Sequence, residues 1–304
     1  MDNITKIVKN ILVTTAFSKN SDFALLRALE IAEKFNSKIT LLHVIQKTRT
    51  DNFLDNPLKK WLPERLWLTT KEYKETLLQE KIQPLLQKNL NIRYFVISQG
   101  KPAQKILQYT KKNKIDLLIS GAHGKYTIRD TFVGTTAEYI AKHTKCPVLI
   151  VKNKPKNAYQ KIFVPVDFSS VSKRAFNYAL KLFPNCCVRL FHVGDYEYDD
   201  ILKEKKQAIK KPKFIEIKNA IFNHLENKMK KIIKGYSKKL NKHPYKITLG
   251  YPGPTIVKEV KKSKQNLVVI GTQGHGRMHY LFIGSVANWV LTECDSDILL
   301  VPPK

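Results

Sequence analysis

Runs of apolar residues without polar alternation recur along the chain at intervals suited to buried strands. In the first half they are Ile11–Thr15, Ile39–Val44, Ile115–Ser120 and Pro147–Val151, while Ile92–Ile97 alternates more clearly between apolar and polar positions. A strand that is apolar at almost every position is typical of a parallel sheet covered on both faces. The first half therefore predicts five strands, one of which lies in a more exposed place.

Helical patterns lie between these strands. Asp22–Phe35, Ser172–Phe183 and Lys218–Leu240 carry apolar residues three and four positions apart, as a helix that buries one face does. Pro102 and Pro254 stand where a first helical turn would begin, after glycine-containing turns. Strands that alternate with helices predict a parallel sheet with right-handed crossovers.

The two halves of the chain repeat one another. ILVTTAFS at Ile11 has its counterpart in IFVPVDFS at Ile162, which sets Asp167 opposite Ala16. Further pairs follow in the same order with nearly the same offset: LLHV and LFHV, GAHGKYTIRDTFVGT and GTQGHGRMHYLFIGS, PVLIV and DILLV. Several landmarks in one order indicate a duplicated domain.

A chain of 304 residues has room for two such domains. The polar stretch Lys152–Gln160 contains Pro155, which does not continue a strand, and it separates the repeats. We therefore expect domains at residues 1–153 and 158–304. Each is predicted to be an α/β, doubly wound domain with an open five-stranded parallel sheet and helices on both faces.

A spaced glycine pattern follows the fourth predicted strand of each half. Glycine, two residues, glycine, nine residues, glycine and then Ser or Thr occur as Gly121, Gly124, Gly134, Thr135 and as Gly271, Gly274, Gly284, Ser285. Glycines allow backbone N–H groups to approach an anion, and a helix that begins there adds unpaired donors. The pattern predicts a phosphate site, to which Arg277 would add charge. The Ser285 hydroxyl would either bind a ligand oxygen or cap the helix.

With these landmarks the sequence resembles the universal stress protein family, whose nucleotide-binding members carry this glycine loop. The resemblance implies a fold of the HUP, adenine nucleotide α-hydrolase-like type. It also implies that Asp167 contacts the adenosine end, that Val193 meets adenine through its backbone, and that the glycine loop with Ser285 holds ribose and phosphates. Asp167 as a cap for the helix near Ser170 remains the alternative. The site expected in domain 2 comprises Pro165, Val166, Asp167, Phe168, Ser169, Val193, Gly271, Thr272, Gly274, His275, Gly276, Arg277, Gly284, Ser285 and Val286.

Domain 1 departs from this pattern. Thr14 and Ala16 stand at the positions of Pro165 and Asp167, so the carboxylate is missing. We expect a weaker, altered or empty site there. Its candidate residues are Gly121, Gly124, Lys125, Gly134 and Thr135, with His123 beside them.

Composition and residue spacing bear on whether the protein binds nucleic acid, crosses a membrane or holds a metal. Lys and Arg number 54 against 25 Asp and Glu, but the excess of +29 is shared by both halves and forms no basic arm. We interpret it as a solvated lysine-rich surface, with a nucleic-acid site as the alternative, and we expect no specific nucleic-acid binding. No run is apolar and long enough for a membrane span, so a cytoplasmic location is expected. Neither the four cysteines nor the histidines have the spacing of a metal site, and we expect reduced thiols.

The expected ligand is ATP or ADP, with or without Mg²⁺. The loop lacks the lysine of GxxxxGK[ST], and no Ser-His-Asp triad can be assembled, so we predict a nucleotide-binding stress or signalling protein without strong catalysis. A slow ATPase and a nucleotide-independent interaction scaffold are the alternatives. Family members pair through their last strands, which implies an intramolecular pseudo-dimer of the two domains through PVLIV and DILLV, or a homodimer.

Overall fold

The chain forms two compact units, Met1–Lys156 and Asn157–Lys304. The structure, a computed structural model, describes residues 8–46, 70–87, 90–97, 100–124, 133–194, 211–236, 240, 243–274 and 283–304. Lys125, His275, Gly276 and Arg277, all expected at the glycine loops, lie outside these described residues.

The described part of unit 1 is an open sheet of parallel strands in the order β3-β2-β1-β4-β5. The strand β3 at one edge is only partly buried, in keeping with its alternating pattern. The elements in chain order are β1 (Asn10–Thr14), α1 (Lys19–Phe35), β2 (Lys38–Val44), α2 (Thr70–Leu86), β3 (Ile92–Ile97), α3 (Pro102–Lys112), β4 (Leu117–Gly121), α4 (Thr135–His143) and β5 (Val148–Val151).

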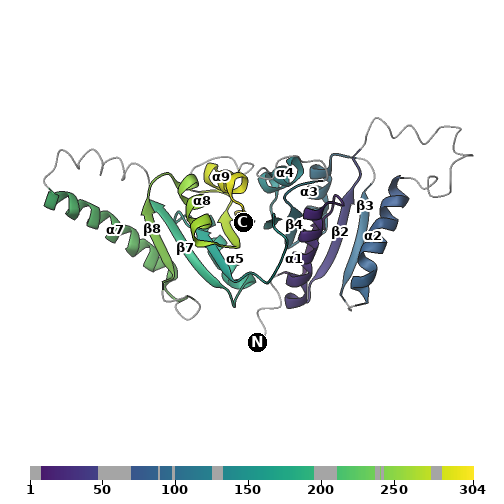
Figure 1. Ribbon diagram of the computed structural model, residues 1–304, viewed down its shortest axis with the longest axis horizontal. Helices are drawn as coiled ribbons and strands as arrows, with labels where there is room; N and C mark the ends of the chain where they lie inside the picture. The colour runs from purple at the N-terminus through teal and green to yellow at the C-terminus, as the bar shows by residue number, and fades with distance from the viewer. Residues whose placement is uncertain are drawn as a thin grey trace, which may run out of the picture. The chain divides into compact units, whose positions relative to one another are not determined.

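The described part of unit 2 repeats this topology, with the order β10-β9-β6-β7-β8 and parallel pairing throughout (Figure 1). The predicted α/β, doubly wound class is therefore confirmed. The elements in chain order are β6 (Lys161–Pro165), α5 (Ser170–Leu182), β7 (Cys187–Gly194), α7 (Lys211–Ile233), β8 (Tyr245–Leu249), α8 (Pro252–Ser263), β9 (Leu267–Gly271), α9 (Ser285–Glu293) and β10 (Asp297–Val301).

The handedness of the crossovers decides which helices share a face. From β1 the chain moves outward to β2 and β3 and then returns past β1 to β4 and β5. Crossovers between parallel strands are right-handed in nearly all sheets, and this rule sets α1 and α2 on one face and α3 and α4 on the other. The same rule pairs α5 with α7 and α8 with α9, and α3 contacts α4 as α8 contacts α9.

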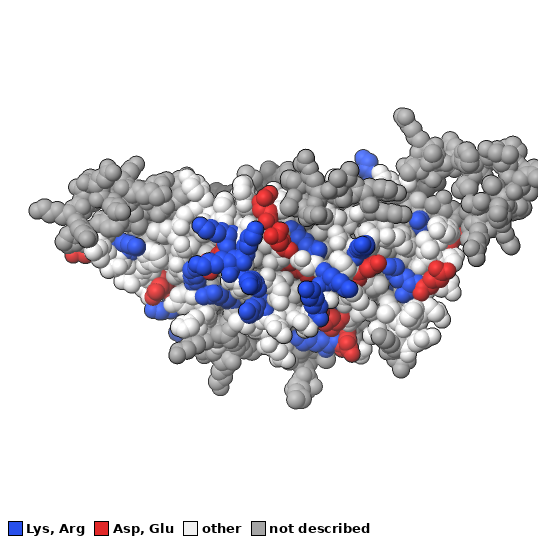
Figure 2. All heavy atoms as spheres, viewed as in Figure 1, with Lys and Arg blue, Asp and Glu red and all other residues white. Residues whose placement is uncertain are grey.

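Burial follows the same plan. The strands β5, β9 and β10 are buried at every position, as expected for strands covered on both faces. Within the described ranges, no helix combines the length and the apolar character that crossing a membrane requires. Basic side chains gather in several groups on the face drawn in Figure 2, with acidic side chains between them.

One predicted helix has different ends in the structure. The expected helix Lys218–Leu240 begins earlier, at Lys211, and ends at Ile233, so the prediction was wrong over its last residues. Gly235 explains the stop, because it adopts a φ of +91°, a left-handed conformation that suits glycine just after a helix. Pro254 lies in the first turn of α8 as expected, although Pro252 is the first helical residue.

Two histidines at repeat-related positions connect the ends of neighbouring strands. His192 Nδ1 lies 2.7 Å from the carbonyl oxygen of Val166, and His43 Nδ1 lies 2.8 Å from that of Thr15. Burial lowers the pKa of both imidazoles, although the hydrogen bond to the carbonyl raises it in part. Each histidine is therefore a neutral donor that secures the turn after the first strand of its unit.

The lowered pKa makes the stability of unit 2 depend on pH. The unfolded chain binds a proton at His192 more readily than the folded one, so this contribution is present above the unfolded pKa of about 6.5 and is lost as the pH falls towards the lower, folded pKa. We expect the free energy of unfolding to decline from pH 7.5 to pH 5, and to decline less in His192→Gln. Urea titrations at both pH values measure this.

The control variant is His224→Gln, which changes an exposed histidine of α7 in the same unit. It should keep the decline of the unmodified protein. A decline of equal size in His192→Gln would show that the buried imidazole does not carry the effect.

Candidate functional site

The strand order reverses between β6 and β9, and three chain segments end at this point. In such a sheet, ligands bind beyond the carboxyl ends of the strands where the order reverses. The strand β6 pairs with both β9 and β7, so the turn Pro165–Ser169, the strand end at Val193 and the loop Gly271–Gly274 lie at one edge of the sheet. The topology thus brings together the described residues of the predicted site.

The turn after β6 holds the Asp167 carboxylate in place. Its Oδ1 accepts a hydrogen bond of 3.0 Å from the backbone N–H of Ser169, and Ser169 in turn caps α5 by accepting from the N–H of Ser172 at 3.1 Å. Phe168 adopts a φ of +67°, which is uncommon for an aromatic residue, and its ring packs on His192 with the ring centroids 4.2 Å apart. The alternative expectation, that Asp167 caps the helix near Ser170, is thus only partly right. Asp167 accepts a hydrogen bond from Ser169, and Ser169 is the cap.

The second oxygen of this carboxylate lies against the glycine loop. A Cβ added to Gly274 would stand 2.6 Å from Oδ2 of Asp167. That distance is too short for any real side chain, so a residue other than glycine would displace the carboxylate or the loop. Gly274 itself is exposed. The pair therefore places a carboxylate oxygen beside an accessible stretch of backbone.

Two further contacts close the loop. The N–H of Thr272 donates to the carbonyl of Val301 at 3.0 Å, and the N–H of Gly284 donates to the carbonyl of Thr272 at 2.7 Å. Gly271 has a packing role, because a Cβ there would lie 2.9 Å from Cγ1 of Val171 on α5. The loop thus leaves β9 and returns to the start of α9 beside it.

The helix α9 begins without a side-chain cap. Gly284 occupies the cap position, and no side chain accepts a hydrogen bond from the first turn. Ser285 is the first helical residue and is exposed, and Val286 is partly exposed. The interpretation of Ser285 as the cap is therefore wrong, because its hydroxyl stands one position too late. Unpaired N–H groups and the helix dipole give this end an affinity for anions.

Val193 lies near the end of β7 with its side chain largely buried. It lies in β7, which pairs with β6 on one side and β8 on the other, and 8% of its surface is exposed. Its neighbour His192 is the residue that reaches across to Val166. The strand end is therefore held in position from both sides.

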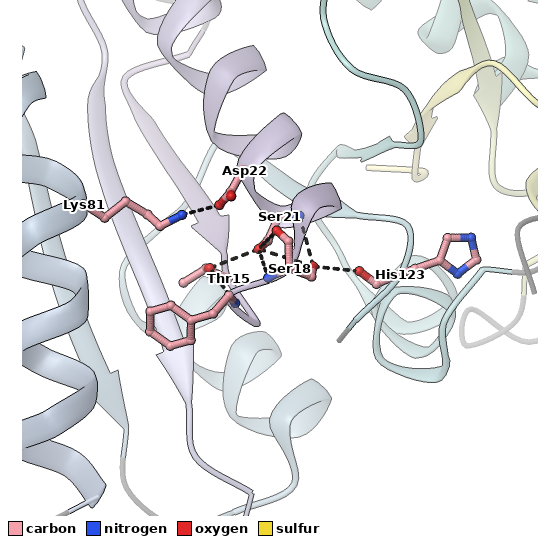
Figure 3. A network of polar contacts seen from close by, with 7 residues as sticks. Thr15, Ser18, Ser21, Asp22, Lys81 and His123 are labelled. Carbon is pink, nitrogen blue, oxygen red and sulfur yellow. Dashed lines mark hydrogen bonds and ion pairs between the residues drawn. The ribbon is translucent and has the colours of Figure 1, made fainter. Parts of the chain in front are cut away.

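In domain 1 the position of Asp167 is taken by Ala16, and hydroxyl groups hold the turn after β1 (Figure 3). Thr15 Oγ1 donates to Ser21 Oγ at 3.2 Å and accepts from the N–H of Phe17 at 3.1 Å. Ser18 Oγ lies 3.1 Å from the carbonyl oxygen of His123, to which it donates. A hydroxyl thus connects the turn after β1 to the loop after β4. A Cβ at Gly124 would meet nothing within 4 Å, in contrast to Gly274.

The loop of domain 1 otherwise closes as in domain 2. The N–H of Gly134 donates to the carbonyl of Ala122 at 2.7 Å, and α4 begins at Thr135 without a side-chain cap. Gly121 packs against α1, since a Cβ there would lie 2.5 Å from the backbone of Asn20. The hydroxyl network was missed by the sequence reasoning. The aligned repeats carry a signal for it, because Thr15 stands where domain 2 has Val166.

Comparison with known proteins agrees with this architecture. The sequence profile of the Universal stress protein family matches residues 8–152 and again residues 158–302. A universal stress protein of Methanocaldococcus jannaschii is 29% identical over 161 residues, which cover 51% of this chain and 87% of that protein. A second from the same organism is 26% identical over 158 residues, 48% of this chain and 96% of that protein.

Solved structures show the same fold over nearly the full chain. A putative universal stress protein from Pseudomonas aeruginosa superposes with a TM-score of 0.70 at 16% identity, over 99% of this chain and 95% of that one. A universal stress protein from Archaeoglobus fulgidus gives a TM-score of 0.62 at 18% identity, over 96% and 98%. The repeated profile match covers most of the sequence, and the chain therefore belongs to the universal stress protein family as a member with two domains in tandem.

Proposed function

We propose that domain 2 binds an adenine nucleotide, ATP or ADP, and that occupancy of this site regulates a cytoplasmic stress or signalling response. The contact between Asp167 and Gly274 carries this proposal. It sets a hydrogen-bond acceptor for the adenosine end beside a loop whose backbone can approach phosphates. The uncapped start of α9 supplies donors to the same place.

Each part of the ligand then has a partner in the site. The Asp167 carboxylate would accept from hydroxyl groups of the ribose, and the backbone at Val193 would meet the adenine edge. The N–H groups of the glycine loop and of Ser285 would hold the phosphates. Asp167 is the single acidic residue among the predicted site residues, so Mg²⁺ would be held mostly by phosphate oxygens and water.

Signalling is favoured over turnover because the loop lacks the lysine of GxxxxGK[ST] and the sequence offers no Ser-His-Asp triad. His192 is a buried donor to Val166 and is committed to that carbonyl. A bound nucleotide can still act, since it shifts a conformational or partner equilibrium by its differential affinity for the two states. A slow ATPase is the rival function, and a scaffold that needs no nucleotide is the third.

The first expected outcome concerns the glycine loop. Gly274→Val and Gly284→Val should weaken ATP binding, because a side chain blocks the approach of backbone to phosphate. At Gly284 an added Cβ stands 3.5 Å from the Thr272 carbonyl, an ordinary contact, so this variant should fold. Isothermal titration calorimetry measures the affinity. Gly124→Val is the matched control in domain 1, where the added side chain meets open space. Unchanged affinity in both loop variants would remove the loop from the site.

The second expected outcome concerns the carboxylate. Losing a charged hydrogen-bond acceptor costs about 1.5–3 kcal/mol, so Asp167→Ala should weaken ATP binding by roughly ten- to hundredfold. Asp167→Asn separates binding from folding, because an amide oxygen can still accept from the N–H of Ser169. It should keep the thermal stability and lose affinity. If Asp167→Asn binds ATP as the unmodified protein does, the carboxylate is not a ligand.

The third expected outcome concerns turnover. We expect ATP hydrolysis well below about 1 per second, the lower end of ordinary enzyme rates. A phosphate-release assay on the full chain measures it. Turnover at or above that rate that disappears in Gly284→Val would establish the ATPase instead.

A further inference from the structure

A groove opens between α5 and α7 of unit 2, on the opposite face of the sheet from α8 and α9. Its volume is about 560 Å³, within the range of small-molecule sites. Among the residues that the structure describes, no acidic side chain and no residue of the glycine loop lines it. The lining residues are Phe168, Lys173, Phe176, Asn177, Lys228, Lys231, Ile232, Lys234 and Tyr236.

The floor of the groove is held by aromatic contacts. Phe176 is buried and meets Tyr236 edge to face, with the ring centroids 5.3 Å apart. The Tyr236 hydroxyl donates to Oδ1 of Asn177 at 2.5 Å, which joins the end of α7 to α5. At the other end Lys228 Nζ lies 5.5 Å from the centroid of the Phe168 ring. The groove thus has fixed walls, and ammonium groups stand along it.

Four ammonium groups share this groove without a carboxylate. The helix α5 contains no Asp or Glu, and α7 contains Glu216 and Glu226. Glu226 lies 3.3 Å from Lys230, which does not line the groove. Among the residues that the structure describes, none forms an ion pair with Lys173, Lys228, Lys231 or Lys234. Like charges that line one groove repel one another, and a bound anion would relieve that repulsion.

The equivalent helices of unit 1 show the contrasting arrangement. Asp22 stands at the repeat position of Lys173, with the same offset that relates Ala16 to Asp167. It forms an ion pair with Lys81, which joins α1 to α2 (Figure 3). Unit 1 thus connects this helix pair by opposite charges. In unit 2 a lysine replaces the carboxylate, so the charge that would pair with the α7 lysines must come from outside the helix pair.

We propose that this groove is a second anion site that binds a small ligand with linked phosphates, separate from the nucleotide site of domain 2. Lysine binds phosphate as a point charge, and several lysines around one cavity suit a multiply charged chain. The groove is short and bounded by two helices, which suits a compact ligand better than the extended backbone of a nucleic acid, because that backbone needs a longer basic track. Phe168 borders the groove directly after Asp167, so a ligand here lies next to the turn of the nucleotide site.

The test is isothermal titration calorimetry of the full chain with inorganic tripolyphosphate. Lys173→Gln/Lys231→Gln should weaken binding by about tenfold or more, because two charge-assisted contacts are lost. Lys181→Gln/Lys218→Gln removes the same charge from positions of the same two helices that do not line the groove, and should keep the affinity. An equal loss in both variants would mean nonspecific attraction and would overturn the proposal.

The nucleotide site is separated by crossing these variants with the loop variant. Tripolyphosphate should bind Gly284→Val as tightly as it binds the unmodified protein. The second expectation rests on the proposed nucleotide site: Lys173→Gln/Lys231→Gln should keep the affinity of the unmodified protein for ATP or ADP. Loss of tripolyphosphate binding in Gly284→Val alone would place the anion at the glycine loop. A single-stranded oligonucleotide that competes at lower concentration than tripolyphosphate would identify a nucleic-acid site instead.

The variant Lys173→Asp tests the proposal independently. It restores the carboxylate that unit 1 has at Asp22, so the α7 lysines gain a partner within the protein. We expect a raised melting temperature and loss of tripolyphosphate binding. A variant that is equally stable or more stable and still binds tripolyphosphate as tightly would show that the groove charges do not hold the anion.

Discussion

The glycine-loop sites of domains 1 and 2 both depend on the close approach of a glycine at the end of a strand to the first turn of a helix. Gly271 lies so near Val171 and Ser172 that a Cβ would overlap them, and Gly121 lies as near to Asn20. Because of this contact, the loop after β9 emerges beside the turn after β6, two segments that lie far apart in the sequence. A larger residue would push the helix and strand apart and separate the loop from the turn.

Given that shared frame, the two units differ in what fills the space between loop and turn. In domain 2 the Asp167 carboxylate faces Gly274, whereas in domain 1 Ser18 donates to the carbonyl of His123. A hydroxyl that is committed to a backbone carbonyl satisfies the protein's own polar groups. A carboxylate beside an exposed glycine leaves a negative charge at the edge where the strand order reverses. The duplication has thus kept one fold and changed the electrostatics of that edge.

The helix pairs on the outer face diverge in the same way. Asp22 and Lys81 join α1 to α2, and such a pair between partly exposed side chains contributes modestly to stability. In unit 2 the Tyr236 hydroxyl and the Phe176 ring take over the joining of the helices. The four lysines of the groove are left without an ion pair within the described part of the unit. In unit 1 an ion pair joins the two helices. In unit 2 a hydrogen bond and an aromatic contact join them instead.

The amino-acid sequence by itself determined the repeat, the alternation of strands and helices, and the glycine loop, because each of these is written in local spacing. It placed most element ends to within a few residues and missed the end of α7, where the conformation of Gly235 outweighs the apolar pattern. It also identified Ala16 and Asp167 as the point of asymmetry between the repeats.

Only the tertiary structure decided that Asp167 faces Gly274, that Gly284 rather than Ser285 is the cap, and that a lysine groove opens between α5 and α7. These features depend on distances between segments that are remote in the chain. Such distances follow from how helices pack on a sheet, and residue spacing along one segment does not record them.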